Sequence, residues 1–316
     1  VYDNLIESVH QNLDPLYKYF DLRKRLLDLD KLHIYDCNVP LVKDMKWHMP
    51  FDQAVEEIKS ALNPLGKEYV EQLGCGLSVD RWTDRYENKG KRSGAYSSGC
   101  YDSNPFILMN YREDNINSAY TLAHEAGHSM HSFYSRKNQP YLYSDYTIFV
   151  AEVASTFNEA LLTRHFLSQD IAPDMRIYLI CREIDNFRGT LYRQTMFAEF
   201  EYQVYKAMEG NEPLTLETFK KIYRDLLERY FGSGVVLDDC LSLECLRIPH
   251  FYFSFYVYKY ATGISAAYAL ADRVISGGET ELNDYLGFLK SGGSKYPIDL
   301  LKSAGVDMLS PEPVKT

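Results

Sequence analysis

Long apolar runs are missing from this chain of 316 residues. No stretch reaches the about 18 consecutive apolar residues that a membrane-spanning helix needs, so we expect no membrane partner. The opening residues, VYDNLIESVH, also lack the basic and then apolar order of a secretory signal peptide. Together these absences predict a cytoplasmic protein.

Cysteine is sparse, and its spacing excludes the usual cysteine-based sites. The chain has no C-x-x-C pair, which argues against a structural zinc site built from thiolates. Cysteines scattered through a long chain suit a reducing compartment better than a disulfide framework. The six residues are Cys37, Cys75, Cys100, Cys181, Cys240 and Cys245.

Basic residues are too few to balance the acidic ones. Lysine and arginine total 34 against 44 aspartates and glutamates, which gives a formal net charge of -10. Nucleic acids are bound by clustered basic side chains, so we expect no nucleic-acid partner. Hydrophobic residues make up 46% of the chain, which at this length is enough for a large core.

Helical periodicity is the dominant pattern that the sequence does contain. Apolar residues recur at helical spacing over 2–28, which predicts one long helix, and residues 49–62 predict a second. Two short strands are expected within residues 92–111, where glycine and serine alternate with aromatics. The expected fold is therefore mainly α, with a small β-sheet near residues 92–111. Because no repeat or long linker interrupts the chain, we expect a single domain over residues 1–316.

Residues 92–100, RSGAYSSGC, are rich in glycine and serine. Such a segment can form an edge strand, whose free N–H and C=O groups pair with an extended peptide. A plain glycine-rich hairpin is the alternative.

The segment TLAHEAGHSMHSFY, residues 121–134, suggests a metal-binding helix. His124 and His128 lie four residues apart and therefore share one helical face. Zinc accepts histidine nitrogens and, in catalytic sites, leaves one position open for water. Glu125 would then act as a general base toward that water. The alternative is an ordinary amphipathic helix that happens to be rich in histidine.

A third ligand is expected from a second helical segment, IFVAEVASTFNEALL, residues 148–162. Glu152 lies in an apolar stretch, where its charge would be uncompensated unless a cation met it. Glu159 follows seven residues later on the same face and could accept a hydrogen bond from a ligand histidine. A solvated or salt-bridged side chain is the alternative for Glu159.

His131 extends the motif to H-E-x-x-H-x-x-H. A metzincin would continue with a glycine and a further histidine, but Phe133 and Tyr134 follow here. We therefore interpret His131 as a structural residue or as one that supports the ligands.

The chain resembles the M3 family of zinc metallopeptidases, and within it oligoendopeptidase F, along nearly its whole length. The match is carried by HEAGHSMHSFYSRKNQPYLYSDYTIFVAEVAST, GKRSGAYSSG, PFILMNY, HFYFSFYVYKYATG and FLKSGGSKYPIDLLKSAGVDM. In that family the third ligand lies in the FVAEVAS helix about two dozen residues beyond the second histidine, and Glu152 lies 24 residues beyond His128.

The resemblance implies a multi-helix, zincin-type catalytic domain with one Zn²⁺ per chain. Its ligands would be His124, His128 and Glu152. Members of the family are longer than this chain, which resembles only their catalytic C-terminal half. The missing N-terminal half of the same protein is therefore an expected partner.

The stretch RIPHFYFSFYVYKYATG, residues 247–263, is the second candidate region. Peptide hydrolysis places negative charge on the scissile carbonyl oxygen, and a nearby hydroxyl or histidine N–H can donate to it. His250 and Tyr260 resemble the donors of the family, and Tyr256 would share a helical face with Tyr260. The alternative is a tyrosine-rich stripe that packs in the core.

These patterns predict a zinc-dependent metalloendopeptidase that cleaves internal bonds of short oligopeptides. A zinc carboxypeptidase on a related helical scaffold is one alternative, because the same metal centre serves both reactions. A helical fragment or subunit without catalytic activity is the other.

Overall fold

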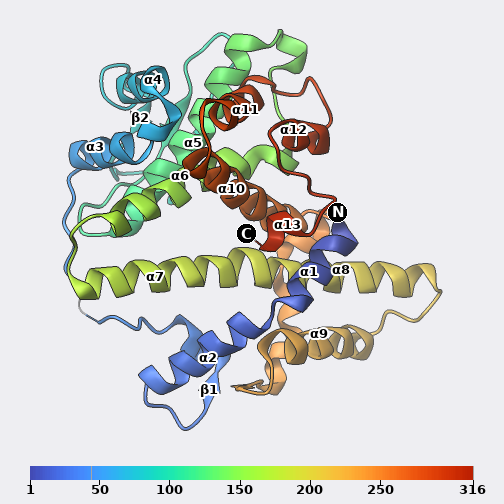
Figure 1. Ribbon diagram of the computed structural model, residues 1–316. Coiled ribbons are helices and arrows are strands. Elements are labelled where there is room, and N and C mark those ends of the chain that lie inside the picture. The colour runs from blue at the N-terminus through green and yellow to red at the C-terminus, as the bar shows by residue number, and fades with distance from the viewer. Residues whose placement is uncertain (44, 316) are drawn as a thin grey trace. The chain divides into compact units, whose positions relative to one another are not determined.

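A computed structural model describes residues 1–43 and 45–315 of the chain. Figure 1 shows that helices dominate this described part, which confirms the expected mainly α fold. The α-helices are α1 (Tyr2–Gln11), α2 (Asp14–Leu26), α3 (Phe51–Ala61), α4 (Lys67–Leu77), α5 (Ile116–Asn138), α6 (Ile148–Ser168), α7 (Pro173–Phe187), α8 (Arg193–Glu209), α9 (Leu216–Phe231), α10 (Tyr258–Ser276), α11 (Glu279–Lys290), α12 (Pro297–Ser303) and α13 (Glu312–Lys315). The strands are β1 (Leu32–His33), β2 (Thr83–Asp84), β3 (Tyr96–Ser98), β4 (Phe106–Leu108) and β5 (Val235–Val236).

The chain forms two compact units. The first unit consists of residues 1–43, 177–262 and 309–315, and the second consists of residues 45–176 and 263–308. Both crossings between the units at 176–177 and 262–263 fall inside helices, α7 and α10, and not in linkers. The sequence pattern therefore gives no boundary signal there, and the single catalytic domain over residues 1–316 stays a prediction.

In the first unit, the expected long helix over residues 2–28 is wrong. Two helices occupy this range, because α1 ends at Gln11 and α2 begins at Asp14. Pro15 lies in the first turn of α2, where its missing N–H breaks no helical hydrogen bond. The Asn12 side chain donates to the Ser8 carbonyl and caps the end of α1.

The first unit is built around α8. This helix packs against α9 and α1, and α9 packs in turn against the 3₁₀ segment Asp239–Arg247. A π-helical segment, Arg188–Tyr192, joins the end of α7 to the start of α8. Buried tyrosines of α9, Tyr223 and Tyr230, fill the space beside α8.

In the second unit, α5 and α6 lie side by side and carry the site (Figure 1). Helix α11 packs on α5, and α3 packs on α6. Helix α6 is apolar around most of its circumference, as expected of a helix that is covered on several sides. Helix α5 begins where the Asn115 side chain accepts a hydrogen bond from the Asn117 backbone N–H.

A three-stranded sheet in the order β2-β4-β3 lies beside α5. Strands β3 and β4 are antiparallel and confirm the two strands expected within residues 92–111. Strand β2 pairs in parallel with β4 and was not expected, because two residues carry too little pattern. A separate parallel pair, β1 with β5, belongs to the first unit.

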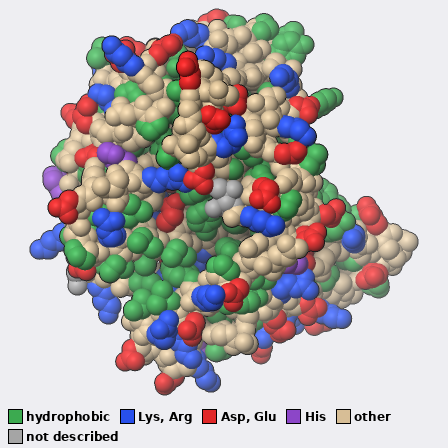
Figure 2. Space-filling model, in the orientation of Figure 1, with side chains coloured by type: hydrophobic (Ala, Val, Ile, Leu, Met, Phe, Trp, Pro, Cys, Tyr) green, Lys and Arg blue, Asp and Glu red, His purple; other side chains and the backbone are tan. Residues whose placement is uncertain are grey.

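The surface carries mixed charge on the face shown in Figure 2. Lysine and arginine side chains are scattered among aspartates and glutamates on this face. Among the described residues, no helix combines the length and the apolar character that crossing a membrane requires.

Candidate metal centre

Helices α5 and α6 approach each other unusually closely at Gly127. A Cβ atom at this position would lie 2.5 Å from the backbone oxygen of Ala154 and 2.6 Å from the Cα of Ser155, so only glycine fits. The glycine inside the histidine motif is thus explained by the close approach of another backbone, as its sequence position suggests. This contact sets Glu152 of α6 opposite the histidines of α5.

His124, His128 and Glu152 converge as the sequence predicts. The Nε2 atoms of His124 and His128 lie 3.3 Å and 3.5 Å from Oε2 of Glu152. The two imidazole rings are 4.8 Å apart between centroids. One ligand atom from each of the three residues lies within 4.8 Å of the others, so the group could hold a metal ion.

Glu159 supports this group from two helical turns further along α6 than Glu152. The Nδ1 atom of His124 donates to Oε1 of Glu159 at 2.7 Å, so a cation that displaces the Nε2 proton would bind at Nε2. Burial lowers the pKa of His124, but hydrogen bonds with Glu152 and Glu159 outweigh this effect and raise that pKa to about 10. For Glu152, burial raises the pKa, but hydrogen bonds with both histidines bring it below its usual value.

Glu125 is buried beside the three converging residues. Only 6% of its surface is exposed, and its Oε2 atom has no hydrogen-bond partner within the described part of the chain. Burial raises the pKa of this carboxyl, although the charges of His124 and His128 oppose the rise. The Ser97 backbone in β3 lies close enough to the Glu125 carboxylate to oppose this rise in its pKa as well. An unpaired carboxylate oxygen of raised basicity can accept a proton from a bound molecule.

Three further residues position this group, and sequence reasoning missed them. Ser155 donates to Oε2 of Glu152 at 3.1 Å and so orients the carboxylate. The buried Asn158 side chain donates to the Ala123 carbonyl at 3.1 Å and ties α6 to α5 beside His124. Gly263 of α10 lies against Glu152, because a Cβ there would be 3.3 Å from the Cβ of Glu152. No spacing rule identifies such residues, since small polar residues and glycines occur in helices for many reasons.

His131 lies away from the converging group and packs in the core. It is 1% exposed, and its ring stacks on Tyr146 with centroids 3.7 Å apart. Burial lowers the pKa of His131 to about 3, so the side chain is neutral. This environment fits the structural interpretation of His131.

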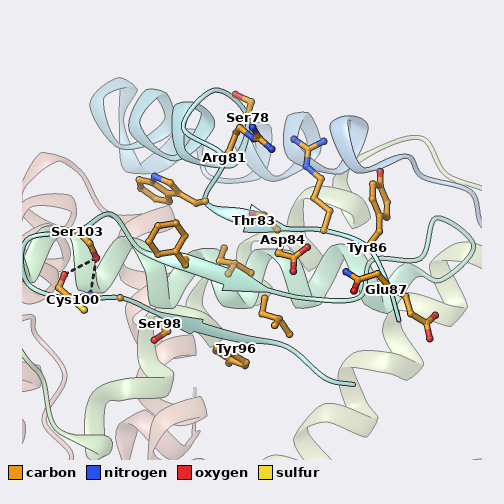
Figure 3. Close-up of a pocket in the computed structure, with 17 residues that line it drawn as sticks. Ser78, Arg81, Thr83, Asp84, Tyr86, Glu87, Tyr96, Ser98, Cys100 and Ser103 are labelled. Atoms are coloured by element: carbon orange, nitrogen blue, oxygen red, sulfur yellow. Dashed lines mark hydrogen bonds between the residues drawn. The ribbon is translucent and has the colours of Figure 1, made fainter. Parts of the chain in front are cut away.

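The small sheet places an edge strand next to α5, as one interpretation of residues 92–100 expects. Strand β3 pairs on one side only, and Ser97 in its middle contacts Ser129 of α5 at 2.8 Å between hydroxyl oxygens. The opposite face of the sheet borders a hollow of about 1290 Å³ (Figure 3). Tyr96 and Ser98 project from β3 into this hollow, together with Asp84 of β2. Whether a peptide pairs with β3 stays a prediction.

The residues predicted to act as donors gather in the first unit, within residues 249–260, which we call the donor segment. His250 lies in a 3₁₀ turn, Pro249–Tyr252, and is exposed. Its ring stacks on Tyr256 at 5.7 Å between centroids and meets Tyr260 edge-on at 6.1 Å. Helix α10 begins only at Tyr258, so the shared helical face predicted for Tyr256 and Tyr260 is wrong. Their rings still contact each other at 5.7 Å, because the preceding turn folds back.

Comparison with known proteins gives matches along the whole chain. Peptidase family M3 matches residues 1–316. The oligopeptidase PepF of Bacillus subtilis (strain 168) is 51% identical over 315 residues, which are 100% of this chain and 47% of that protein. The crystal structure of oligoendopeptidase-F from Enterococcus faecium is 35% identical with a TM-score of 0.76, covering 100% of this chain and 49% of that one. A Chlamydophila abortus structure described as a peptidase is 44% identical with a TM-score of 0.92, covering 99% and 52%. The chain spans about half the length of the relatives it matches.

Proposed function

The chain belongs to peptidase family M3, and we propose that it carries the catalytic centre of a zinc-dependent endopeptidase that hydrolyses internal bonds of short oligopeptides. The observation that carries this proposal is the convergence of His124, His128 and Glu152 next to the unpaired carboxylate oxygen of Glu125. Metal analysis combined with mapping of cleaved peptides tests it. A cytoplasmic location and the peptide substrates belong to the same proposal.

The donor set suits zinc better than harder metals. Two imidazole nitrogens and one carboxylate oxygen are common ligands of catalytic zinc, whereas calcium and magnesium prefer oxygen ligands alone. Ligand atoms about 2.0 to 2.1 Å from a tetrahedral zinc ion are about 3.3 Å from one another. The distances of 3.3 Å and 3.5 Å from the histidine nitrogens to Glu152 are close to that value. One ion per chain follows from a single such group among the described residues.

In the proposed reaction, a bound zinc ion would supply Lewis acidity toward the scissile carbonyl and would lower the pKa of the attacking water. His124 and His128 would hold the ion through Nε2 together with the Glu152 carboxylate, and Glu159 fixes the orientation of the His124 ring by accepting its Nδ1–H. The Oε2 atom of Glu125 takes the proton from the attacking water. The same carboxyl then returns that proton to the leaving amine nitrogen.

We further propose that the donor segment stabilises the carbonyl oxygen as it becomes negative. A tyrosine hydroxyl and a histidine N–H are suitable donors, and the ring contacts of His250, Tyr256 and Tyr260 support joint action. The free edge of β3 would pair with the extended substrate beside Glu125. This role is supported by the contact of the Ser97 backbone with that carboxylate.

Replacing Tyr260 by phenylalanine is expected to lower kcat by about 10²- to 10³-fold, as the loss of one donor to a developing oxyanion does. KM should change little, because the donor acts mainly in the transition state. Steady-state kinetics on a quenched oligopeptide measures both constants. Tyr35→Phe is the matched control, since this tyrosine of the same unit is 64% exposed and lies outside the donor segment. If Tyr256→Phe gives the kinetic pattern and Tyr260→Phe does not, the two roles are exchanged.

The half of the family protein that this chain does not match is the proposed partner. The relatives are about twice as long as the matched region. Residues outside that region can therefore contribute to a substrate channel in them. Large apolar side chains are exposed on both units, including Leu142 and Tyr296 in the second and Tyr252 and Phe253 in the first. Exposed apolar side chains of this size are suited to a docking surface.

Addition of that other half, in cis or in trans, is therefore expected to raise the melting temperature of residues 1–316 and their activity on oligopeptides. Thermal unfolding and peptide cleavage, each measured with and without the other half, check this expectation. Bovine serum albumin at equal mass serves as the control for unspecific protection. Equal melting temperature and full activity of residues 1–316 alone would rule the partner out.

A further inference from the structure

Helix α8 binds the donor segment through two hydrogen bonds within the first unit. Oε1 of Glu201 accepts the backbone N–H of Phe255 at 2.6 Å. One helical turn later, the hydroxyl of Tyr205 contacts the Ser254 hydroxyl at 2.5 Å. The Tyr205 ring also stacks on the Phe255 ring with centroids 5.0 Å apart. Two adjacent residues of the donor segment are thus attached to one face of α8.

Phe255 has a backbone conformation that an aromatic residue rarely adopts. Its φ angle is +54°, in the left-handed region, where the Cβ atom crowds the backbone. Such a residue keeps this conformation only when its surroundings hold it there. The hydrogen bond to Glu201 and the ring contacts with Tyr205 and Tyr2 supply that restraint.

The left-handed residue determines where the proposed donors lie. Tyr256 follows Phe255 directly, and the Tyr256 N–H donates to the Phe253 carbonyl across the turn. This turn brings the Tyr256 ring onto His250 and against Tyr260. If Phe255 relaxed to an ordinary negative φ, the chain direction would change and the three rings would separate.

We propose that Glu201 is a positioning residue for the peptidase reaction: by accepting the Phe255 N–H, it holds the donor segment in the strained turn that sets His250, Tyr256 and Tyr260 together. This inference rests on the proposed function, because it assigns Glu201 an effect on catalysis through those three residues. Glu201 itself touches no reacting atom in this account.

The surroundings of Glu201 do little to stabilise a buried carboxyl, which is not expected of a residue that serves stability alone. It is 4% exposed, lines an apolar cavity of about 440 Å³ with Phe200 and Phe219, and its Oε2 atom has no hydrogen-bond partner among the described residues. Burial of this carboxyl is unfavourable and raises its pKa, although the Phe255 N–H and the charge of Lys259 oppose the rise. Glu199, two residues earlier on α8, is equally buried but contacts His10, Gln203, Arg229 and Tyr230.

Two substitutions of Glu201 separate the hydrogen bond from the charge. Glu201→Met keeps the length of the side chain but accepts no hydrogen bond, whereas Glu201→Gln keeps a carbonyl oxygen for the Phe255 N–H. In the complete natural protein loaded with metal, we expect Glu201→Met to lower kcat at least about 10-fold with little change in KM, because misplaced groups lose catalytic power steeply. The Glu201→Gln variant should keep kcat close to that of the wild type. Glu199→Met is the matched control and should lower the melting temperature but not kcat.

Hydrogen exchange of the backbone amides of residues 253–256 tests the positioning without reference to activity. Exchange should be at least about 10-fold faster in Glu201→Met and unchanged in Glu201→Gln. Unchanged exchange in Glu201→Met, or an equal loss of kcat in both variants, would overturn the proposal. If Glu201→Met does not fold, Glu201→Asp decides, because its shorter side chain no longer reaches the Phe255 N–H that Oε1 of Glu201 accepts at 2.6 Å. Faster exchange with lower kcat in Glu201→Asp supports positioning, and wild-type values of both refute it. Full kcat in the Tyr256→Phe and Tyr260→Phe variants would instead count against the proposed donors, and the exchange result would still stand.

Discussion

Replacing Glu125 by glutamine is expected to abolish most of the peptidase activity while the fold and the metal remain. The substitution keeps the shape of the side chain but removes the carboxylate oxygen that takes the proton from water. Loss of a positioned general base lowers kcat by about 10²- to 10⁴-fold, and Glu125 acts twice in the proposed reaction, so we expect the upper end. Kinetics on an oligopeptide, together with metal analysis of the purified variant, measures the effect.

Glu57→Gln is the matched control for this variant. Glu57 is a glutamate of the same second unit that is less buried than Glu125 and pairs with a histidine, His165, at 2.8 Å. It lies outside the converging group, so its substitution should leave kcat within about twofold of the wild type. Near-normal turnover in Glu125→Gln would remove Glu125 from the mechanism.

Replacing Glu152 by alanine is expected to release the metal. Two histidines alone leave zinc one protein ligand short of a catalytic site. Loss of a hydrogen-bond partner outside the ligand set lowers metal affinity by about 10- to 100-fold. We expect the affinity of Glu152→Ala for zinc to fall by more than that. Titration with a competing zinc chelator gives the dissociation constants.

Glu159→Gln provides the comparison on the same helix. Glu159 contacts the Nδ1 atom of His124 and not the proposed ion. Its substitution should therefore weaken zinc binding by only about 10- to 100-fold. Stoichiometric zinc in Glu152→Ala under conditions that empty Glu159→Gln would show that the third ligand is another residue.

The convergence of His124, His128 and Glu152 could be predicted from the sequence, because helical geometry ties the spacing of residues to the direction of their side chains. Residues four apart share a face, which places His124 beside His128 without knowledge of the rest of the fold. Glu152 was found because a carboxylate in an apolar helix needs a cation. Each of these inferences depends on one local rule.

The remaining residues of the site depend on tertiary contacts that no local rule describes. Asn158 bonds a carbonyl 35 residues away, and Glu201 bonds an N–H 54 residues away. Their identity as helix residues says nothing about those partners. The donor segment was found through the family resemblance, but the turn at Phe255 was not, since a positive φ at an aromatic residue contradicts its own preference.

Element boundaries were predictable where glycine or proline marks them. The turn-forming segments EGNEP, residues 209–213, and FGSG, residues 231–234, coincide with the ends of α8 and α9. The break between α1 and α2 was missed, because the apolar spacing continues through it and Pro15 is as compatible with a first helical turn as with a kink. The two-residue strands β1, β2 and β5 were also missed, because periodicity needs a longer window.

The most direct test of the central claim combines metal content with the position of peptide cleavage. The complete natural protein, stripped by chelator and reloaded with zinc, should bind one ion per chain and regain cleavage of a quenched oligopeptide. Mass spectrometry of the products should show a cut at an internal bond, and the cut should persist when the C-terminus of the peptide is blocked. Release of single C-terminal residues that stops on blocking would indicate a carboxypeptidase. Bound zinc with no cleavage of either peptide would contradict a catalytic role for this centre.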